Sequence, residues 1–171
     1  GAMTTSEYKT FVEIIKRTLG SFGGKDLLIR RISDGFLGVG GDSHDGRKAA
    51  YNFFLELNLY DEATKYLTTT EEAKKANDFR VILQHFAALK AKCKDGGRTN
   101  DYIRLRELGN WLLEGNRLSK RDRKTIEETL LPSLGFIVEK DAIEWFVERF
   151  KKGPAVEKET VLICMDYLNK N

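Results

Sequence analysis

The chain has 171 residues, of which 41% are hydrophobic and 32% are charged, with 2 Pro and a net charge of +3. This length and composition are typical of one globular domain or two small ones, and they exclude a disordered or fibrous chain. No apolar run has the length of a membrane span, and no segment resembles a secretory signal.

The N-terminal part of the chain predicts two helices followed by a loop. Hydroxyl side chains at residues 4–6 can cap a helix, and apolar residues then follow at helical spacing until Gly20. A second, short amphipathic helix begins at Asp26 and reaches Phe36. The next segment, residues 35–46, reads GFLGVGGDSHDG, where a regular helix would cost about 1 kcal/mol per Gly. We predict a loop there, with at most one helical turn.

The clearest pattern follows this glycine-rich segment, between Gly46 and Leu57. Apolar residues recur there at positions i, i+3, i+4 and i+7, which form one face of a helix, and these are Ala50, Phe53, Phe54 and Leu57. Asn58 is suited to stop this helix, and a further helix is predicted over residues 60–67.

A polar helix is predicted next. Thr69 and Glu72 have the spacing of a capping box, and the segment EEAKKANDF is almost wholly polar. This composition suits a linker helix, near residues 70–78, better than an element of a core. We therefore predict a first helical module over residues 4–76 and a second over residues 77–171.

Five further helices are predicted in the second half. Their expected limits are Phe79–Leu89, Asp101–Gly115, Ser119–Pro132, Glu139–Phe150 and Pro154–Leu168. Asn100 or Asp101 is expected to cap the second of them, and Ser119 with Asp122 the third. Pro132 should terminate that third helix. No strand-like alternation accompanies these patterns, so the predicted fold class is all-α.

The apolar spacing of the helix at residues 46–57 returns 93 residues later. In this second copy the matching residues are Ile143, Phe146, Val147 and Phe150. The repetition indicates two similar helical modules in tandem.

Charge is unevenly spread along the chain. Residues 1–76 carry 11 basic and 11 acidic side chains, whereas Lys90 to Lys124 carry 11 basic and 5 acidic ones. The candidate partner-binding residues lie at or before the start of a helix, where the macrodipole disfavours positive charge, and they are Arg117, Lys120, Arg121, Arg123 and Lys124. Such a patch can bind an acidic protein surface or phosphates. The lack of interleaved aromatic residues that are expected to be exposed favours a protein partner over RNA.

No set of residues has the pattern of a catalytic, cofactor-binding or metal site. The segment GSFGGKD, residues 20–26, lacks the spacing of a nucleotide-binding loop and has an acid where a hydroxyl is needed. His44 and His85 are far apart in sequence, and neither Cys93 nor Cys164 has a second ligand nearby. The cysteines lie in dissimilar surroundings, so we expect free thiols in a reducing compartment.

The order and apolar spacing of these helices resemble the tandem caspase-recruitment domains (CARDs) at the N-terminus of RIG-I-like receptors and Dicer-related RNA helicases. The resemblance covers nearly the whole chain. Its segments are YKTFVEIIKRTL, GRKAAYNFFLELNLYDEATKYL, DFRVILQHFAALK, GFIVEKDAIEWFVERF and VLICMDYL. The glycine-rich loop before Arg47 and the insertion KKGPAVEKE depart from the family pattern.

This resemblance implies two tandem death-fold (CARD-like) bundles that recruit other proteins through charged surface patches. The partners would be other CARD-like proteins or proteins of a small-RNA pathway. The charge pattern leaves one alternative open, a helical nucleic-acid-binding domain that contacts the phosphates of RNA through the basic segment 90–124. The parent protein would be an ATP-dependent RNA helicase of small-RNA silencing or antiviral RNA sensing, whereas these 171 residues would have no enzyme activity and no cofactor. Its location would be intracellular, in the cytoplasm with the nucleus as a further site.

Overall fold

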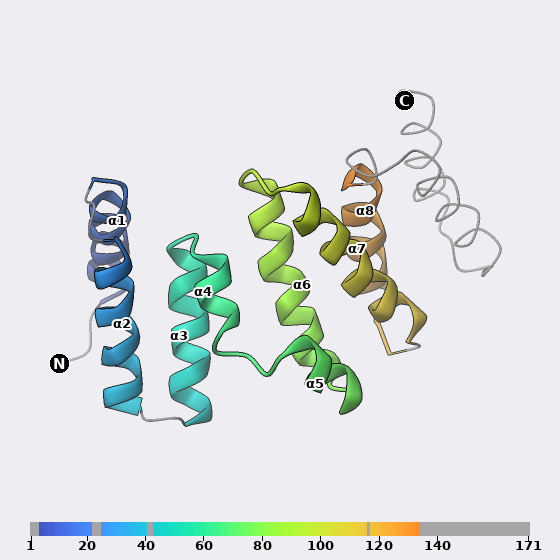
Figure 1. Ribbon diagram of the computed structural model, residues 1–171, viewed down its shortest axis with the longest axis horizontal. Helices are drawn as coiled ribbons and strands as arrows, with labels where there is room; N and C mark the ends of the chain where they lie inside the picture. The colour runs from blue at the N-terminus through green and yellow to red at the C-terminus, as the bar shows by residue number, and fades with distance from the viewer. Residues whose placement is uncertain (1–3, 22–24, 41–42, 116, 134–171) are drawn as a thin grey trace. The chain divides into compact units, whose positions relative to one another are not determined.

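The computed structural model describes residues 4–21, 25–40, 43–115 and 117–133. Every regular element within these ranges is an α-helix, which confirms the all-α class (Figure 1). The chain divides into two compact units, with the boundary between Thr69 and Thr70. Each unit is described by itself below.

The first unit contains four helices: α1 (Thr5–Ser21), α2 (Lys25–Gly40), α3 (His44–Glu56) and α4 (Tyr60–Thr64). Helix α3 packs against α2 and α4. Its predicted apolar face is buried, as expected, and consists of Ala50, Phe53, Phe54 and Leu57.

Both ends of α3 are fixed by capping. At its start, Ser43 Oγ accepts a hydrogen bond from the Gly46 N–H at 3.1 Å. At its end, Asn58 has a left-handed φ of 60°, which confirms its role as a stop. The N–H groups of Asn58 and Leu59 donate to the carbonyls of Leu55 and Phe54, at 3.0 and 2.9 Å. These two bonds form a Schellman motif, which satisfies carbonyls that a helix end would otherwise leave unpaired.

Aromatic rings connect α3 to its neighbours. The ring of Phe53 lies 6.4 Å from that of Tyr8 and 6.1 Å from that of Phe11, both on α1. The ring of Phe54 stacks on that of Tyr66 at 5.7 Å, beyond the end of α4. Arg47 Nε donates to the main-chain oxygen of Tyr66 at 3.2 Å, so the chain is held to α3 shortly before the unit ends.

The prediction of a loop over residues 35–46 is wrong for the first half of this segment. Helix α2 continues through Gly35 and Gly38 to Gly40, and α3 already begins at His44. Helix propensity is a weak preference that tertiary packing overrides, and α2 lies against α3. The helix predicted over residues 60–67 is shorter than expected, since α4 ends at Thr64 and turns follow.

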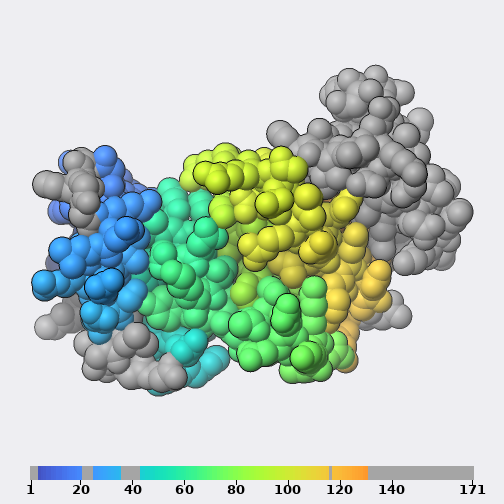
Figure 2. All heavy atoms as spheres, in the orientation of Figure 1, coloured from blue at the N-terminus to red at the C-terminus, as the bar shows by residue number. Residues whose placement is uncertain are grey.

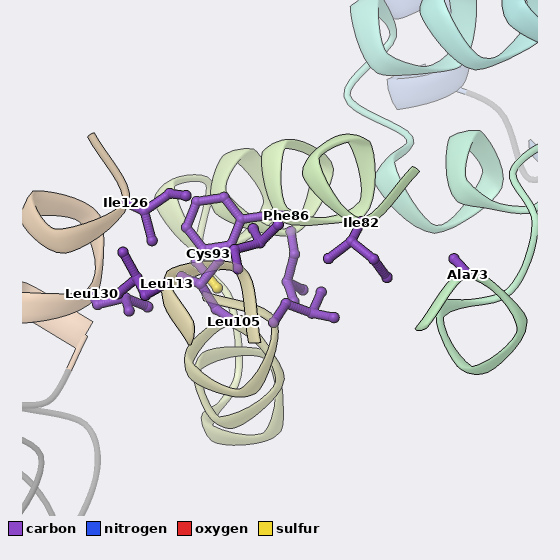
Figure 3. Packing of buried hydrophobic residues seen from close by; sticks show 11 residues of the cluster. Ala73, Ile82, Phe86, Cys93, Leu105, Leu113, Ile126 and Leu130 are labelled. Carbon is purple, nitrogen blue, oxygen red and sulfur yellow. The ribbon is translucent and has the colours of Figure 1, made fainter. Parts of the chain in front are cut away.

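The second unit contains α5 (Thr70–Lys75), α6 (Phe79–Lys94), α7 (Thr99–Glu114) and α8 (Lys120–Ser133). Helix α6 packs against α5 and α7, and α7 also packs against α8. Buried side chains from all four helices form one cluster (Figure 3). Figure 3 shows Ala73 of α5 beside Ile82 at one end of this cluster, and Ile126 and Leu130 of α8 at the other.

A glycine allows α7 and α8 to approach closely. A Cβ atom built on Gly109 would lie 2.7 Å from Leu130 Cδ1 and 2.9 Å from Leu130 Cδ2. Both residues are buried, and Leu130 is fully so. Any larger residue at position 109 would therefore have to displace the buried Leu130 side chain.

The helix predicted as a linker is instead part of the second unit. Ala73 is fully buried and belongs to its core cluster, although the rest of α5 is polar. A single alanine gives no apolar periodicity, so composition alone pointed to a solvated linker. The unit boundary accordingly lies before α5, whereas the sequence placed the modules' boundary after residue 76.

Two predictions about helix ends in the second unit had different outcomes. Ser119 caps α8 as expected, since its Oγ accepts from the Asp122 N–H at 3.1 Å. Helix α7 begins earlier than predicted, with Arg98 at the N-cap position. Asp101 acts from the third position of the helix, where its Oδ2 accepts from the Arg98 N–H at 2.9 Å. The helices predicted at residues 139–150 and 154–168, and with them the second copy of the repeat, lie outside the described residues.

Candidate functional site

Helix α8 carries four of the five predicted partner-binding residues, and its position is fixed by its apolar side. Ile126 and Leu130 are buried in the core cluster, and Leu130 fills the space above Gly109. Lys120 and Arg121 are the first two residues of the helix, next to the positive end of its macrodipole. Their charges therefore do not stabilise α8, and helix formation does not explain them.

Arg123 faces inward rather than outward. Its Nη2 donates to the main-chain oxygen of Leu113 at 3.1 Å, and its Nη1 lies 3.8 Å from Glu127 Oε1. Helix α7 ends at Glu114, so the Leu113 carbonyl is among the last four, which have no partner within the helix. The guanidinium thus satisfies the C-terminal end of α7 and lies beside a carboxylate that is 4% exposed. Arg123 holds α7 and α8 together.

Arg117, in the connection between α7 and α8, is exposed but also has partners within the unit. Its Nη1 donates to the main-chain oxygen of Asn77 at 3.3 Å. In the amide orientation that satisfies both groups, Asn77 Oδ1 accepts from Arg117 Nη2 at 2.6 Å and from Nη1 at 3.2 Å. Asn77 is 40 residues away in sequence and follows α5. Arg117 therefore joins the start of the α8 region to the end of α5.

The other three predicted residues lie on one side of the first two turns of α8. Lys120 and Arg121 are exposed, and neither side chain has a hydrogen bond or ion pair with another residue in the part of the chain that the structure describes. Lys124, one turn after Lys120, is partly exposed and lies 4.0 Å from Glu128 Oε1, a weak surface pair. We call Lys120, Arg121 and Lys124 the α8 basic surface.

The second basic segment, from Lys90 to Arg98, is also partly occupied by internal contacts. Lys92 Nζ lies 3.1 Å from Asp101 Oδ1, which links α6 to the start of α7. Burial by itself would raise the pKa of Asp101, but the Arg98 N–H, Lys92 and the charge of Arg104 outweigh it and hold this pKa below its usual value. Lys94 and Arg98 remain exposed. Fewer cations can therefore reach a ligand here than the sequence suggests.

The described part of the chain contains one cysteine and two histidines. Cys93 is a buried free thiol, and burial, with the nearby charge of Asp101, raises its pKa to about 11. It is therefore a protonated, unreactive thiol at neutral pH. His44 is exposed at the start of α3 and His85 is buried in α6, so the two lie in different units, as their separation in sequence predicted. Within the described residues no three acidic, histidine or cysteine side chains gather as a metal site would require.

The sequence did not reveal the partner of Arg117. Asn77 has a left-handed φ of 54° and lies between two helices in an exposed turn. An Asn after a short helix is a recognisable sign of a helix stop. Nothing local, however, connects it with an arginine 40 residues later.

No family model, no curated protein and no solved structure matches this chain. In the ranges that the structure describes, none of the helices combines the length and apolar character needed to cross a membrane.

Proposed function

We propose that this chain is a non-enzymatic protein-recruitment module, built from two tandem death-fold (CARD-like) bundles, that binds an acidic protein surface through the α8 basic surface. The proposal includes the setting that the family resemblance implies. The module would be the N-terminal part of an RNA helicase that acts in the cytoplasm, in small-RNA silencing or antiviral RNA sensing. The all-helical fold and its division into two units are compatible with this proposal.

The observation that carries the proposal is the separation of the basic residues into two groups. Arg123 and Arg117 have internal partners that account for their positions. Lys120 and Arg121 open a helix, where their charge is unfavourable, and are exposed. The fold does not explain why these two residues are basic. The opposite side of their helix is anchored in the core, so they form a rigid surface that an acidic partner can bind.

Charge reversal on this surface tests the proposal. Proteins retained from a native extract by the wild-type chain are compared, by quantitative mass spectrometry, with those retained by the double variant Lys120→Glu, Arg121→Glu. Lys48→Glu, an exposed residue of α3 in the first unit, is the matched control. We expect a set of proteins that is lost with the double variant and kept with the control. Identical sets for all three chains would contradict the proposal.

The alternative function is phosphate binding by the same helix together with the exposed Lys94 and Arg98. Five neutralised phosphates on a single strand, one for each cation of the α8 basic surface and one each for Lys94 and Arg98, give a slope of about −3.5 in a plot of log affinity against log salt concentration. Fluorescence polarisation with labelled RNA at low salt distinguishes the two functions. Binding with such a slope, lost in both Lys120→Glu and Lys94→Glu, would favour RNA. No binding at low salt would exclude it.

A further inference from the structure

Helix α5 is short and buries little of its own surface. It has six residues, and Ala73 is its only buried side chain. Glu71, Glu72 and Lys75 are exposed (Figure 2 shows the green α5 segment at the molecular surface). Isolated helices of this length are unstable in water, because nucleation costs more than a few hydrogen bonds return. The helical form of α5 therefore depends on contacts with the rest of the second unit.

The C-terminal end of α5 is a Schellman motif centred on Asn77. The Asn77 N–H donates to the Lys74 carbonyl at 3.1 Å, and the Asp78 N–H donates to the Ala73 carbonyl at 2.8 Å. Both bonds require the left-handed backbone of Asn77. Asp78 then caps α6 through the Val81 N–H, at 3.4 Å. Contacts to Asn77 consequently stabilise the end of α5 and its junction with α6.

Arg117 is the contact that joins this motif to the α8 basic surface. Its guanidinium bonds to both the main-chain and the side-chain oxygen of Asn77. It also lies three residues before Lys120 and is exposed, so a partner on the surface can reach it. The oxygens of Asn77 are neutral acceptors, whereas a carboxylate carries a negative charge and can accept two parallel N–H···O bonds from a guanidinium. A carboxylate that pairs with the Nη1 and Nη2 groups of Arg117 therefore competes with Asn77 for the same donors.

We propose that Arg117 couples the α8 basic surface to α5. When the surface is free, Arg117 holds the Asn77 motif and keeps α5 folded against α6. When a carboxylate of an acidic partner binds the guanidinium of Arg117, the Asn77 motif opens and α5 separates from α6. This inference rests on the proposed function, since it assigns a regulatory consequence to partner binding at the same surface.

Release of α5 would change the chain that connects the two units. Arg47 holds Tyr66 in the first unit, and α5 begins at Thr70 in the second. The connection is short while α5 is folded. A helical residue advances about 1.5 Å and an extended one about 3.3 Å, so an unfolded α5 roughly doubles the reach of its own segment. Partner binding would thereby lengthen the segment of chain between Tyr66 and α6.

Amide hydrogen exchange of the intact chain, followed by NMR, tests whether Arg117 stabilises the Asn77 motif. The reporters are the N–H groups of Asn77 and Asp78, both bonded within the motif. In Arg117→Ala we expect them to exchange about tenfold faster than in the wild type. Arg121→Ala is the matched control, because this neighbouring arginine is exposed and should leave both rates unchanged. Equal rates in the two variants would overturn the inference.

A synthetic poly-glutamate peptide, used as the acidic probe, tests whether binding of an acidic partner opens the Asn77 motif. At saturation we expect the same two amides of the wild type to accelerate to the rate seen in Arg117→Ala, and the variant itself to show no further change. Binding of the peptide, measured by fluorescence anisotropy, without this acceleration would overturn the coupling and leave the proposed function standing. Absence of peptide binding would contradict the proposed docking surface, and with it the coupling.

Discussion

Gly109 of α7 lies directly against the side chain of Leu130 of α8: a Cβ atom on Gly109 would lie 2.7 Å from Leu130 Cδ1. Glycine inside a helix costs about 1 kcal/mol relative to alanine, so helix propensity alone would favour Gly109→Ala. The added methyl group would, however, overpack a buried contact, at a cost of about 1–3 kcal/mol. We expect a net destabilisation of about 1 kcal/mol, measured by urea unfolding.

Gly35→Ala is the control for that experiment. Gly35 also lies within a helix, α2, but among the described residues no atom beyond its chain neighbours and its own helical backbone lies within 4 Å of the position its Cβ would take. Only the propensity gain operates there, so this variant should be more stable by about 0.5–1 kcal/mol. Stabilisation by both substitutions would show that α7 and α8 are not packed as described.

Arg123 and Arg121 should respond differently to truncation. Arg123→Ala removes the donor to Leu113 and the cation beside the buried Glu127, and we expect the free energy of unfolding to fall by about 1.5–3 kcal/mol. Arg121→Ala should change it by no more than about 0.5 kcal/mol, since the side chain is exposed. Circular dichroism during urea titration measures both. Equal changes in the free energy of unfolding for the two variants would contradict the assignment of Arg123 to internal contacts and of Arg121 to the exposed surface.

Asp101 makes the stability of the second unit depend on pH. Its folded-state pKa lies below its unfolded value, near 3.8, because Arg98, Lys92 and Arg104 outweigh its burial. A depressed carboxylate pKa contributes stability above the unfolded pKa, and this contribution is lost as pH falls through the folded pKa. Asp101→Asn should therefore be less stable than the wild type at pH 7. The difference should shrink as pH falls below about 4.

Urea unfolding of both chains at several pH values measures this difference. Asp95→Asn is a suitable control, because Asp95 is exposed at the end of α6. The control should follow the wild type throughout. A constant gap between the wild type and Asp101→Asn across the acidic range would contradict the assigned pairing.

Substitutions of Asn58 test whether its left-handed conformation ends α3 in the first unit. At its φ of 60°, a residue with a Cβ other than Asn or Asp is disfavoured by about 1–2 kcal/mol, whereas glycine is not. We expect Asn58→Ala to lower the melting temperature and Asn58→Gly to leave it nearly unchanged. Asn52→Ala, at an exposed helical position of α3, should not destabilise the unit. Equal melting temperatures for the alanine and glycine variants at position 58 would exclude the left-handed stop.

Local features of the chain could be predicted where a pattern repeats over a few residues. The i, i+3, i+4, i+7 spacing identified the buried face of α3, since periodicity depends only on helix geometry. Ser119 and Asn58 were recognisable as helix ends, because their bonds reach only residues close in sequence. The glycine-rich end of α2 could not be predicted, because its intrinsic helix propensity is low and its packing against α3 is not visible in the sequence.

The sequence by itself determined an all-helical chain, the core face of α3 and a surplus of cations between Lys90 and Lys124. Only the tertiary structure decided which of these cations are bound to other groups of the protein. Arg123 meets a carbonyl of another helix, and Arg117 meets a residue 40 positions away. Periodicity and capping follow from contacts within a turn or two, whereas the pairing of a long side chain depends on how separate helices pack. Charge counted along a sequence therefore locates a basic region, but the fold determines which part of it can bind a partner.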